Sequence, residues 1–131
     1  MSALATEDYI AIQQLYARYN HAIDSGNGEA WASTFTPDGT FSSGPANPAG
    51  TEALSAFATA FAQRMKARHW INNLVIEPAE GGATGSCYLM LLRLAKEDKP
   101  TSMATTAIYH DTLTKAGGEW KFATRTVQGD V

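Results

Sequence analysis

The chain has 131 residues, 18% of them charged, and a formal net charge of −3, which predicts a single domain spanning residues 1–131. The acidic balance offers no basic surface for a phosphate backbone, so nucleic acid is not an expected partner. One cysteine, Cys87, excludes an internal disulfide, and with only three histidines beside it we expect no metal and no cofactor. The absence of a leader-like or membrane-spanning pattern predicts a cytoplasmic protein with no membrane partner.

The first predicted helix runs from a cap at Thr6 to about Asp24. Its apolar side chains recur at spacings of three and four residues, as Tyr9, Ile12, Tyr16, Tyr19 and Ile23. A buried tyrosine needs a partner for its hydroxyl, so at least one should face a polar cavity or rim. Asp24 lies at the unfavourable, negative end of the helix dipole. Two explanations stay open for it: pairing with His21 on the helix surface, or reaching into a cavity that the helix covers.

A short helix over about 27–34, containing Trp31, follows the first one. Residues 36–39 predict a turn, residues 40–42 a brief strand, and residues 43–50 a loop that could form the lip of a pocket. A third helix is expected from a cap at Thr51 to about Met65, because Leu54, Phe57 and Phe61 fall at helical spacing.

The stretch from Arg68 to Ile76 reads as a strand with polar groups on one face. Successive side chains leave a strand on opposite faces; one face then carries His69, Ile71, Asn73 and Val75, and the other carries Trp70, Leu74 and Ile76. A histidine and an asparagine on one face suit the wall of a small-molecule pocket.

Three more strands are predicted over 83–94, 103–114 and 120–128. The first of them is apolar on both faces, which predicts a central strand covered on each side. Short connections make neighbouring strands antiparallel. Helices followed by such a meander indicate an α+β domain whose curved, mainly antiparallel sheet wraps the N-terminal helices.

A set of separated signatures covers nearly the whole chain: Tyr16-x-x-Tyr19, Asp24, Trp31, Phe35, Asp38-Gly39, Phe41, Arg68-His69-Trp70, Asn73, Trp120-x-Phe122 and Arg125. Their order resembles the nuclear transport factor 2-like (cystatin-like cone) superfamily, in its SnoaL-like and scytalone dehydratase-like branch. The resemblance implies a cone with a pocket between the concave sheet face and the helices. It also implies that His69 faces this pocket and that Asp24 reaches it. In the dehydratases that pair is an acid/base histidine and the carboxylate that orients it.

Such a pair suits proton transfer, because imidazole titrates near neutrality and a carboxylate on one ring nitrogen fixes the tautomer. The expected activity is that of a cofactor-independent lyase or isomerase on a small cyclic, aromatic or polyketide-like molecule, with His69 and Asp24 as catalytic residues. The candidate substrate-binding residues are Tyr16, Trp31, Phe41, Phe61, Asn73 and Tyr109. For each of these an ordinary structural role is the alternative, and His110 is expected to point outward from the sheet.

Some positions depart from the dehydratase pattern. Where two dehydratase tyrosines would align, this chain has Ile23 and Phe41, so scytalone itself is not the expected substrate. The alternative function is that of a noncatalytic ligand-binding or assembly subunit, resembling the small subunit of aromatic-ring dioxygenases. An outer sheet face carrying Trp70, Leu74, Ile76, Met90 and Leu92 predicts a homo-oligomer, with a dimer as the first expectation and a trimer as the second.

Overall fold

The computed structural model describes residues 3–131. Within this range the chain forms three helices, α1 (Thr6–Asp24), α2 (Gly28–Ala32) and α3 (Thr51–Arg64). It also forms five strands, β1 (Phe35–Ser43), β2 (Ala67–Ala79), β3 (Gly82–Arg93), β4 (Ser102–Ala116) and β5 (Glu119–Gly129). None of the helices in the described range is long and apolar enough to cross a membrane.

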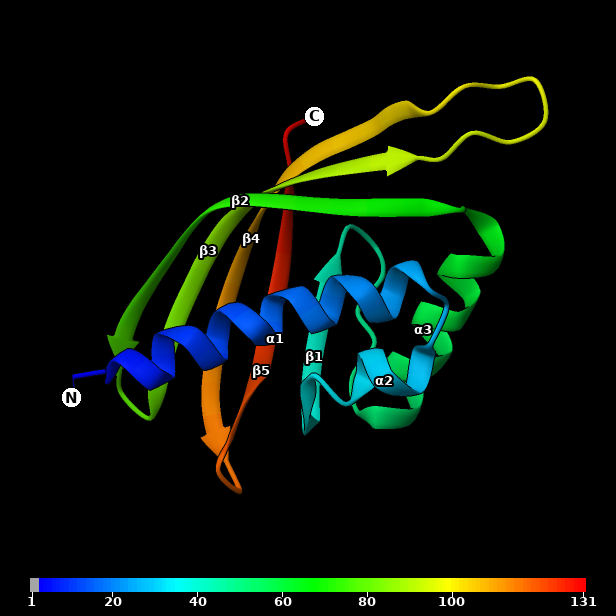
Figure 1. Cartoon of the computed structure of the whole chain (residues 1–131). Helices are drawn as coiled ribbons and strands as arrows, with labels where there is room; N and C mark the ends of the chain where they lie inside the picture. The colour runs from blue at the N-terminus through cyan, green and yellow to red at the C-terminus, as the bar shows by residue number, and fades with distance from the viewer. Residues whose placement is uncertain (1–2) are drawn as a thin grey trace.

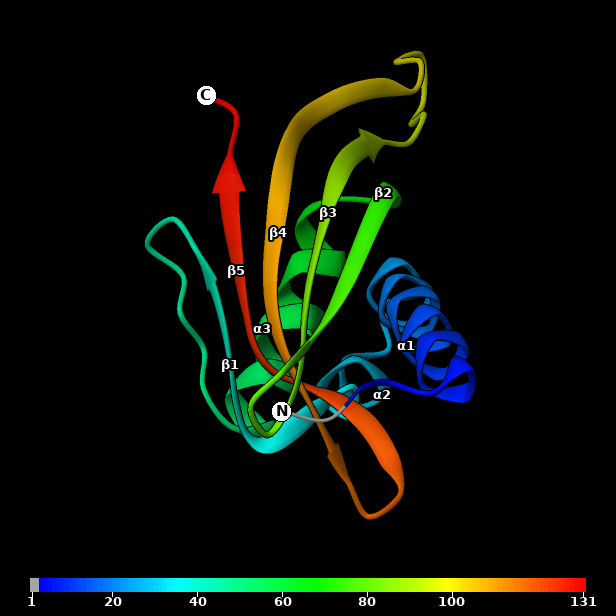
Figure 2. The same cartoon turned by 90° about the vertical axis from the view of Figure 1, so that its left-hand side faces the viewer.

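One curved sheet holds all five strands, in the order β1-β5-β4-β3-β2. The β1 strand runs parallel to β5, and the other neighbours are antiparallel. The sheet bends without closing, and the helices pack on its concave side, with α1 lying across it (Figures 1 and 2). The predicted α+β cone is therefore confirmed. Because β2 is an edge strand, its predicted functional residues lie at the rim of the cone and not at its centre.

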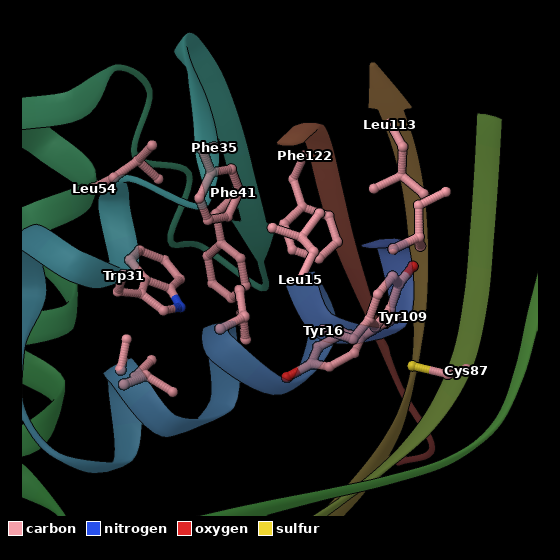
Figure 3. Close-up of a cluster of buried hydrophobic side chains, with 14 of the residues drawn as sticks. Leu15, Tyr16, Trp31, Phe35, Phe41, Leu54, Cys87, Tyr109, Leu113 and Phe122 are labelled. Atoms are coloured by element: carbon pink, nitrogen blue, oxygen red, sulfur yellow. The ribbon is translucent and has the colours of Figure 1, made fainter. Parts of the chain in front are cut away.

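The core fills the space between the helices and the concave face. Figure 3 shows Trp31 and Leu54 entering it from the helices and Phe122 and Leu113 from the sheet. Each of these side chains is at most 3% exposed, and full burial of such a side chain stabilises the fold by about 1.5–3 kcal/mol. The stripe predicted on the first helix is the face that α1 buries here, since Ile12, Tyr16 and Tyr19 belong to the same cluster.

Both predicted helix caps are displaced by one residue. Ala5 precedes α1, and its backbone N–H is bound by the Asp8 carboxylate at 3.0 Å, so Thr6 is already helical. Gly50 precedes α3 with a φ of 87°, in a region that favours glycine, and Thr51 is the first helical residue. In neither helix does a side chain at the N-cap satisfy the backbone.

The strand predicted over 40–42 is longer than expected. The β1 strand begins at Phe35 and includes the four residues predicted as a turn, and its register against β5 shifts between Phe35 and Thr40. The Phe122 N–H also donates to the Thr34 carbonyl at 2.9 Å. Pairing with β5 therefore overrides the local turn signal at Pro37 to Gly39.

A bulge in β2 reverses the predicted faces of its second half. The register against β3 shifts between Asn72 and Val75, and Asn73 adopts a φ of 56°, which is rare for a residue other than glycine. Leu74 and Ile76, predicted to face outward, pack against the core instead. Val75 and Asn73 are exposed. Alternation predicted the faces correctly only as far as Ile71.

The convex face of the sheet is uncovered in the single chain. On β3 the buried residues alternate with partly or fully exposed ones, and Tyr88 is 54% exposed. The expectation that this strand is covered on both sides is therefore wrong for the single chain. On the neighbouring strand β2, Trp70 is 56% exposed and lies opposite Met90 of β3.

Candidate functional site

The end of α1 and the start of β2 meet at a carboxylate and a histidine. Asp24 is the last residue of α1 and His69 is near the start of β2, and these two ends lie on the same side of the molecule in Figure 1. The His69 Nδ1 lies 2.6 Å from Asp24 Oδ1. The His69 backbone N–H also donates to both oxygens of this carboxylate, at 3.2 and 3.1 Å. Asp24 therefore holds both the ring and the main chain of His69.

These contacts offset the unfavourable position of Asp24 in the helix dipole. Arg68 adds a longer ion pair, with its Nε 3.8 Å from Asp24 Oδ2. Of the two explanations that the sequence left open for Asp24, the structure shows the contact with His69. An N–H at His69 Nδ1 donates to the carboxylate, which leaves Nε2 as the acceptor of the neutral ring.

His69 forms part of the wall of a cavity inside the cone. The cavity has a volume of about 340 Å³, near the lower end of the range usual for small-molecule sites. Most of its wall is apolar, including Ile23, Phe41, Phe57, Phe61, Leu89, Leu91 and Val127. The rings of His69 and Phe61 are 5.6 Å apart. His69 Nε2 makes no hydrogen bond within residues 3–131, so it is free to act on a ligand.

A second hollow, of about 410 Å³, lies between α1 and β2 and is also bordered by His69. Asn20 lines it and is buried, and its Oδ1 has no hydrogen-bond partner in the described part of the chain. Tyr16 and Asp24 line the same groove, each about one helical turn from Asn20 along α1. His69 therefore separates the inner cavity from a groove that reaches exposed residues such as Trp70.

A second aspartate, Asp111, forms an ion pair that is buried in the middle of the sheet. Arg125 on β5 donates from Nε to Asp111 Oδ1 at 2.7 Å and from Nη2 to Oδ2 at 2.8 Å. The Tyr16 hydroxyl donates to the same Oδ2. Both charged side chains are at most 1% exposed. Burial opposes the charge on Arg125, but the charge and hydrogen bonds of Asp111, together with Tyr19 and Tyr109, hold the Arg125 pKa well above its usual value.

The rings around this pair come from α1 and from the sheet. The Arg125 Cζ lies 3.7 Å from the ring centroid of Tyr109, 4.3 Å from that of Phe122 and 4.4 Å from that of Tyr19. The Tyr16 hydroxyl can approach because Gly85 has no side chain; a Cβ at that position would collide with it. Burial, with the nearby Asp111 charge, raises the Tyr16 pKa far above its usual value.

The structure places three of the predicted substrate-binding residues in the cavity wall, Tyr109, Phe41 and Phe61. Three others lie elsewhere. Tyr16 lines the outer groove, and its hydroxyl is engaged by Asp111. Trp31 is fully buried behind the wall, stacked on Phe57, and its Nε1 has no partner within residues 3–131.

The third displaced residue is Asn73. It is exposed outside the cavity, because the bulge in β2 turns it away. His110, by contrast, lies on the outer face as expected, where its Nε2 is 2.7 Å from Gln128 Oε1.

Sequence reasoning missed the Arg125–Asp111 pair and Tyr19 as parts of this region. The register of β4 against β5 shifts between Leu113 and Thr112, opposite Phe122 to Thr124. That shift puts Phe122 and Arg125, three residues apart, on the same inner face, which simple alternation assigns to opposite faces. The available signal was Asp111, which shares the inward parity of Tyr109 and needs a buried partner.

The described part of the chain holds no group of three or more His, Cys, Asp or Glu side chains arranged to bind a metal ion. The free thiol of Cys87 is 1% exposed. Burial raises its pKa to about 12, although the charge of Arg125 opposes this rise. Its thiolate is therefore absent at neutral pH, and His69 with Asp24 remains the candidate catalytic group.

Three solved structures illustrate what the fold is similar to. A variant of Rv3472, a protein of unknown function from Mycobacterium tuberculosis, is 31% identical, with a TM-score of 0.88 over 94% of this chain and 72% of that chain. A Catenulispora acidiphila structure in complex with S-DNPA is 28% identical, with a TM-score of 0.84 over 96% of each chain. A Nostoc punctiforme protein of unknown function with a cystatin-like fold is 24% identical, with a TM-score of 0.87 over 98% of this chain and 96% of that chain.

A search of curated proteins found no significant match. The family model described as a SnoaL-like domain matches residues 5–126, which is nearly the whole described chain. The expected superfamily, with its nuclear transport factor 2-like and cystatin-like fold, is therefore confirmed. The chain belongs to the SnoaL-like domain family.

Proposed function

We propose that this protein is a cofactor-independent lyase or isomerase that transfers a proton beside the carbonyl group of a small cyclic or aromatic, polyketide-like molecule. One observation carries the proposal. His69, in the wall of an apolar cavity, is bound to Asp24 through Nδ1, while its Nε2 has no partner within residues 3–131. A neutral imidazole in this arrangement can accept a proton and return it in a later step.

In the proposed reaction, His69 Nε2 takes a proton from the carbon next to the carbonyl, and the C–H electron pair forms an enolate. Asp24 stabilises the resulting imidazolium. The imidazolium then returns the proton. In a dehydration the proton goes to a departing hydroxyl group, which leaves as water while a carbon–carbon double bond forms. In an isomerisation it goes to another carbon.

The character of the cavity supports a ring compound as the ligand. Its wall is mainly aliphatic and aromatic, with few polar groups, as pockets for such ligands usually are. The Catenulispora acidiphila structure of similar fold was solved with a small molecule bound. That complex supports a ligand-binding role for the cone in this chain as well.

A test that does not require the natural substrate is hydrogen–deuterium exchange beside a carbonyl. We expect the wild type to accelerate exchange of the acidic CH₂ protons of 2-tetralone in D₂O, followed by ¹H NMR. Replacing the base, His69→Gln, should lower the enzyme-catalysed rate about a hundredfold or more. Asp24→Asn should give a rate between that variant and the wild type, because the ring loses its anionic partner.

The matched control is His110→Gln, which removes an exposed histidine outside the cavity and should leave exchange unchanged. An exchange rate in His69→Gln equal to that of the wild type would remove His69 from the mechanism. If the wild type bound 2-tetralone without accelerating exchange at all, the noncatalytic ligand-binding subunit would become the better assignment.

We also propose that the chain forms a homodimer through the convex face of β2 and β3. Trp70 and Tyr88 are more than half exposed there, next to Met90, and a contiguous apolar surface of this kind usually marks an interface. Light scattering with size-exclusion chromatography should give twice the mass of the chain for the wild type and one chain for Trp70→Glu. Three times the mass would indicate a trimer, and a monomeric wild type would exclude the interface.

A further inference from the structure

The groove between α1 and β2 is lined by a stripe of α1 side chains that lies beside the stripe buried in the core. Its members, Gln13, Ala17, Asn20 and Asp24, recur at spacings of four, three and four residues, which places them on one face of the helix. Gln13 and Ala17 are exposed and Asp24 is half-buried, but Asn20 is only 9% exposed. The stripe therefore brings one buried amide to a groove of about 410 Å³.

The oxygen of this amide is unpaired. Asn20 Oδ1 is shielded from water by the folded chain and has no hydrogen-bond partner within residues 3–131. Such an atom is uncommon in native proteins, because the hydrogen bond to water that is lost on burial is not replaced. The Tyr16 hydroxyl, one turn away, already donates to Asp111. Asp24, one turn away on the other side, can only accept. Asn20 Oδ1 therefore lacks a donor among the groups next to it on the helix.

The opposite wall of the groove, on β2, is apolar. Ile71 and Leu74 line it, and both are half-buried. Simple alternation sends two strand residues three positions apart to opposite faces, but the bulge at Asn73 returns Leu74 to the side of Ile71. The groove thus combines an apolar wall with one unpaired polar atom. In small-molecule sites, a few polar groups of this kind fix the orientation of a mainly apolar ligand.

The charges at the groove indicate which donor fits. Asn20 Oδ1 is a carbonyl oxygen, so its partner must bring an O–H or an N–H group. Asp24 lies one turn along α1 and disfavours an anion, whereas the exposed Arg68, with its Nε 3.8 Å from Asp24 Oδ2, disfavours a cation. A neutral hydroxyl group meets both conditions, and the apolar wall suits an aromatic ring that carries it.

We propose that this groove is a second ligand site, separate from the inner cavity, that binds a neutral phenol. The phenol hydroxyl donates to Asn20 Oδ1, and the ring lies against Ile71 and Leu74. Because Asn20 already lines the groove, a rotation of its side chain presents Oδ1 to the ligand without movement of the helix. The site involves no proton transfer by His69, so it and the proposed reaction stand or fall independently.

Titration of the ¹⁵N-labelled protein with 2-naphthol, followed by NMR, tests the site. We expect the backbone amide signals of Ala17, Asn20 and Leu74 to shift. 2-Methoxynaphthalene keeps the ring system but has no proton to donate, so it should bind at the same positions about tenfold more weakly. In Asn20→Leu, which replaces the amide by an apolar group of similar size, the preference for 2-naphthol should fall to near unity.

The same variant has a readout that needs no ligand. Asn20→Leu removes an unpaired buried oxygen, so its midpoint of thermal unfolding should equal or exceed that of the wild type. The matched control is Gln13→Leu, which removes an exposed amide from the same face of α1; it should keep the preference for 2-naphthol.

Three results would overturn the proposal. The first is equal binding of the two naphthalenes by the wild type, which needs no variant. The second is a set of shifts confined to cavity residues such as Leu89 and Val127, because 2-naphthol would then occupy the inner cavity only. The third is a lower unfolding midpoint in Asn20→Leu, which would mean that a fixed water already satisfies the amide.

Discussion

Asp24 and Asp111 each hold a basic side chain, yet the two pairs differ in what remains free. Asp111 and Arg125 lie on neighbouring strands in the middle of the sheet, and both carboxylate oxygens are used. Asp24 and His69 join a helix end to an edge strand, and one ring nitrogen of the histidine, which lines the cavity, has no partner in the described part of the chain. In the first pair, both carboxylate oxygens are bound by groups of the core. In the second pair, one histidine nitrogen can still exchange a proton with a ligand.

The largest effect on stability is expected from replacing Arg125. Arg125→Met should lower the free energy of unfolding by about 3–5 kcal/mol, because it leaves Asp111 buried without its cation. Urea unfolding followed by circular dichroism measures this loss. The double variant Arg125→Met with Asp111→Leu should recover part of it, since no unpaired charge remains. A loss of less than about 1 kcal/mol in the single variant would be the size expected of an exposed ion pair and would contradict the burial of Arg125 and Asp111.

The bulge in β2 separates the segment that carries His69 from the segment that covers the core. Asn73 has a φ of 56°, so Asn73→Val should lower the free energy of unfolding by about 1–2 kcal/mol. Asn73→Gly, which tolerates this backbone conformation, should stay within a few tenths of a kcal/mol of the wild type. Thermal unfolding of both variants gives the comparison, and equal stability of the two would argue against the left-handed conformation.

Asp24→Asn should affect stability less than Arg125→Met while affecting exchange more. The amide keeps one oxygen for the His69 backbone, so we expect a loss of only about 1 kcal/mol. The side-chain ¹⁵N shifts of His69 should show the Nδ1–H tautomer in the wild type and a mixture in the variant, because Asp24 no longer selects it. Unchanged ¹⁵N shifts would mean that Asp24 does not control the ring.

The smallest effect is expected at Cys87. Its thiol is buried, and its pKa is raised to about 12 even though Arg125 is near. At pH 8 the folded protein should therefore not react with a disulfide reagent such as DTNB, whereas the urea-unfolded chain should react completely. Rapid reaction of the folded protein would show that the inner face near Arg125 opens more readily than its burial indicates.

Much of the fold could be predicted because its signals are local. The helical spacing along α1 and the short strand connections each depend on residues close in sequence. The juxtaposition of Asp24 and His69, 45 residues apart, followed from the family resemblance. Spacing alone left Asp24 between His21 and the cavity.

The faces of the strands were less predictable, because a bulge depends on the partner strand. The shift in β2 moved Asn73 out of the cavity and Leu74 into the core. The shift in β5 brought Arg125 to the inner face beside Asp111. In both cases one extra residue inverts every later side chain, and nothing local in the sequence marks it.

The amino-acid pattern alone therefore specifies an α+β chain with an amphipathic first helix, a late antiparallel sheet and a histidine near the start of a strand. Tertiary pairing settles which polar groups are satisfied. Arg125 and Tyr16 bind both oxygens of Asp111, whereas Asp24 binds one ring nitrogen of His69 and the other has no partner within residues 3–131. Periodicity depends on neighbours in the chain, but hydrogen-bond saturation depends on groups that only the folded sheet brings together.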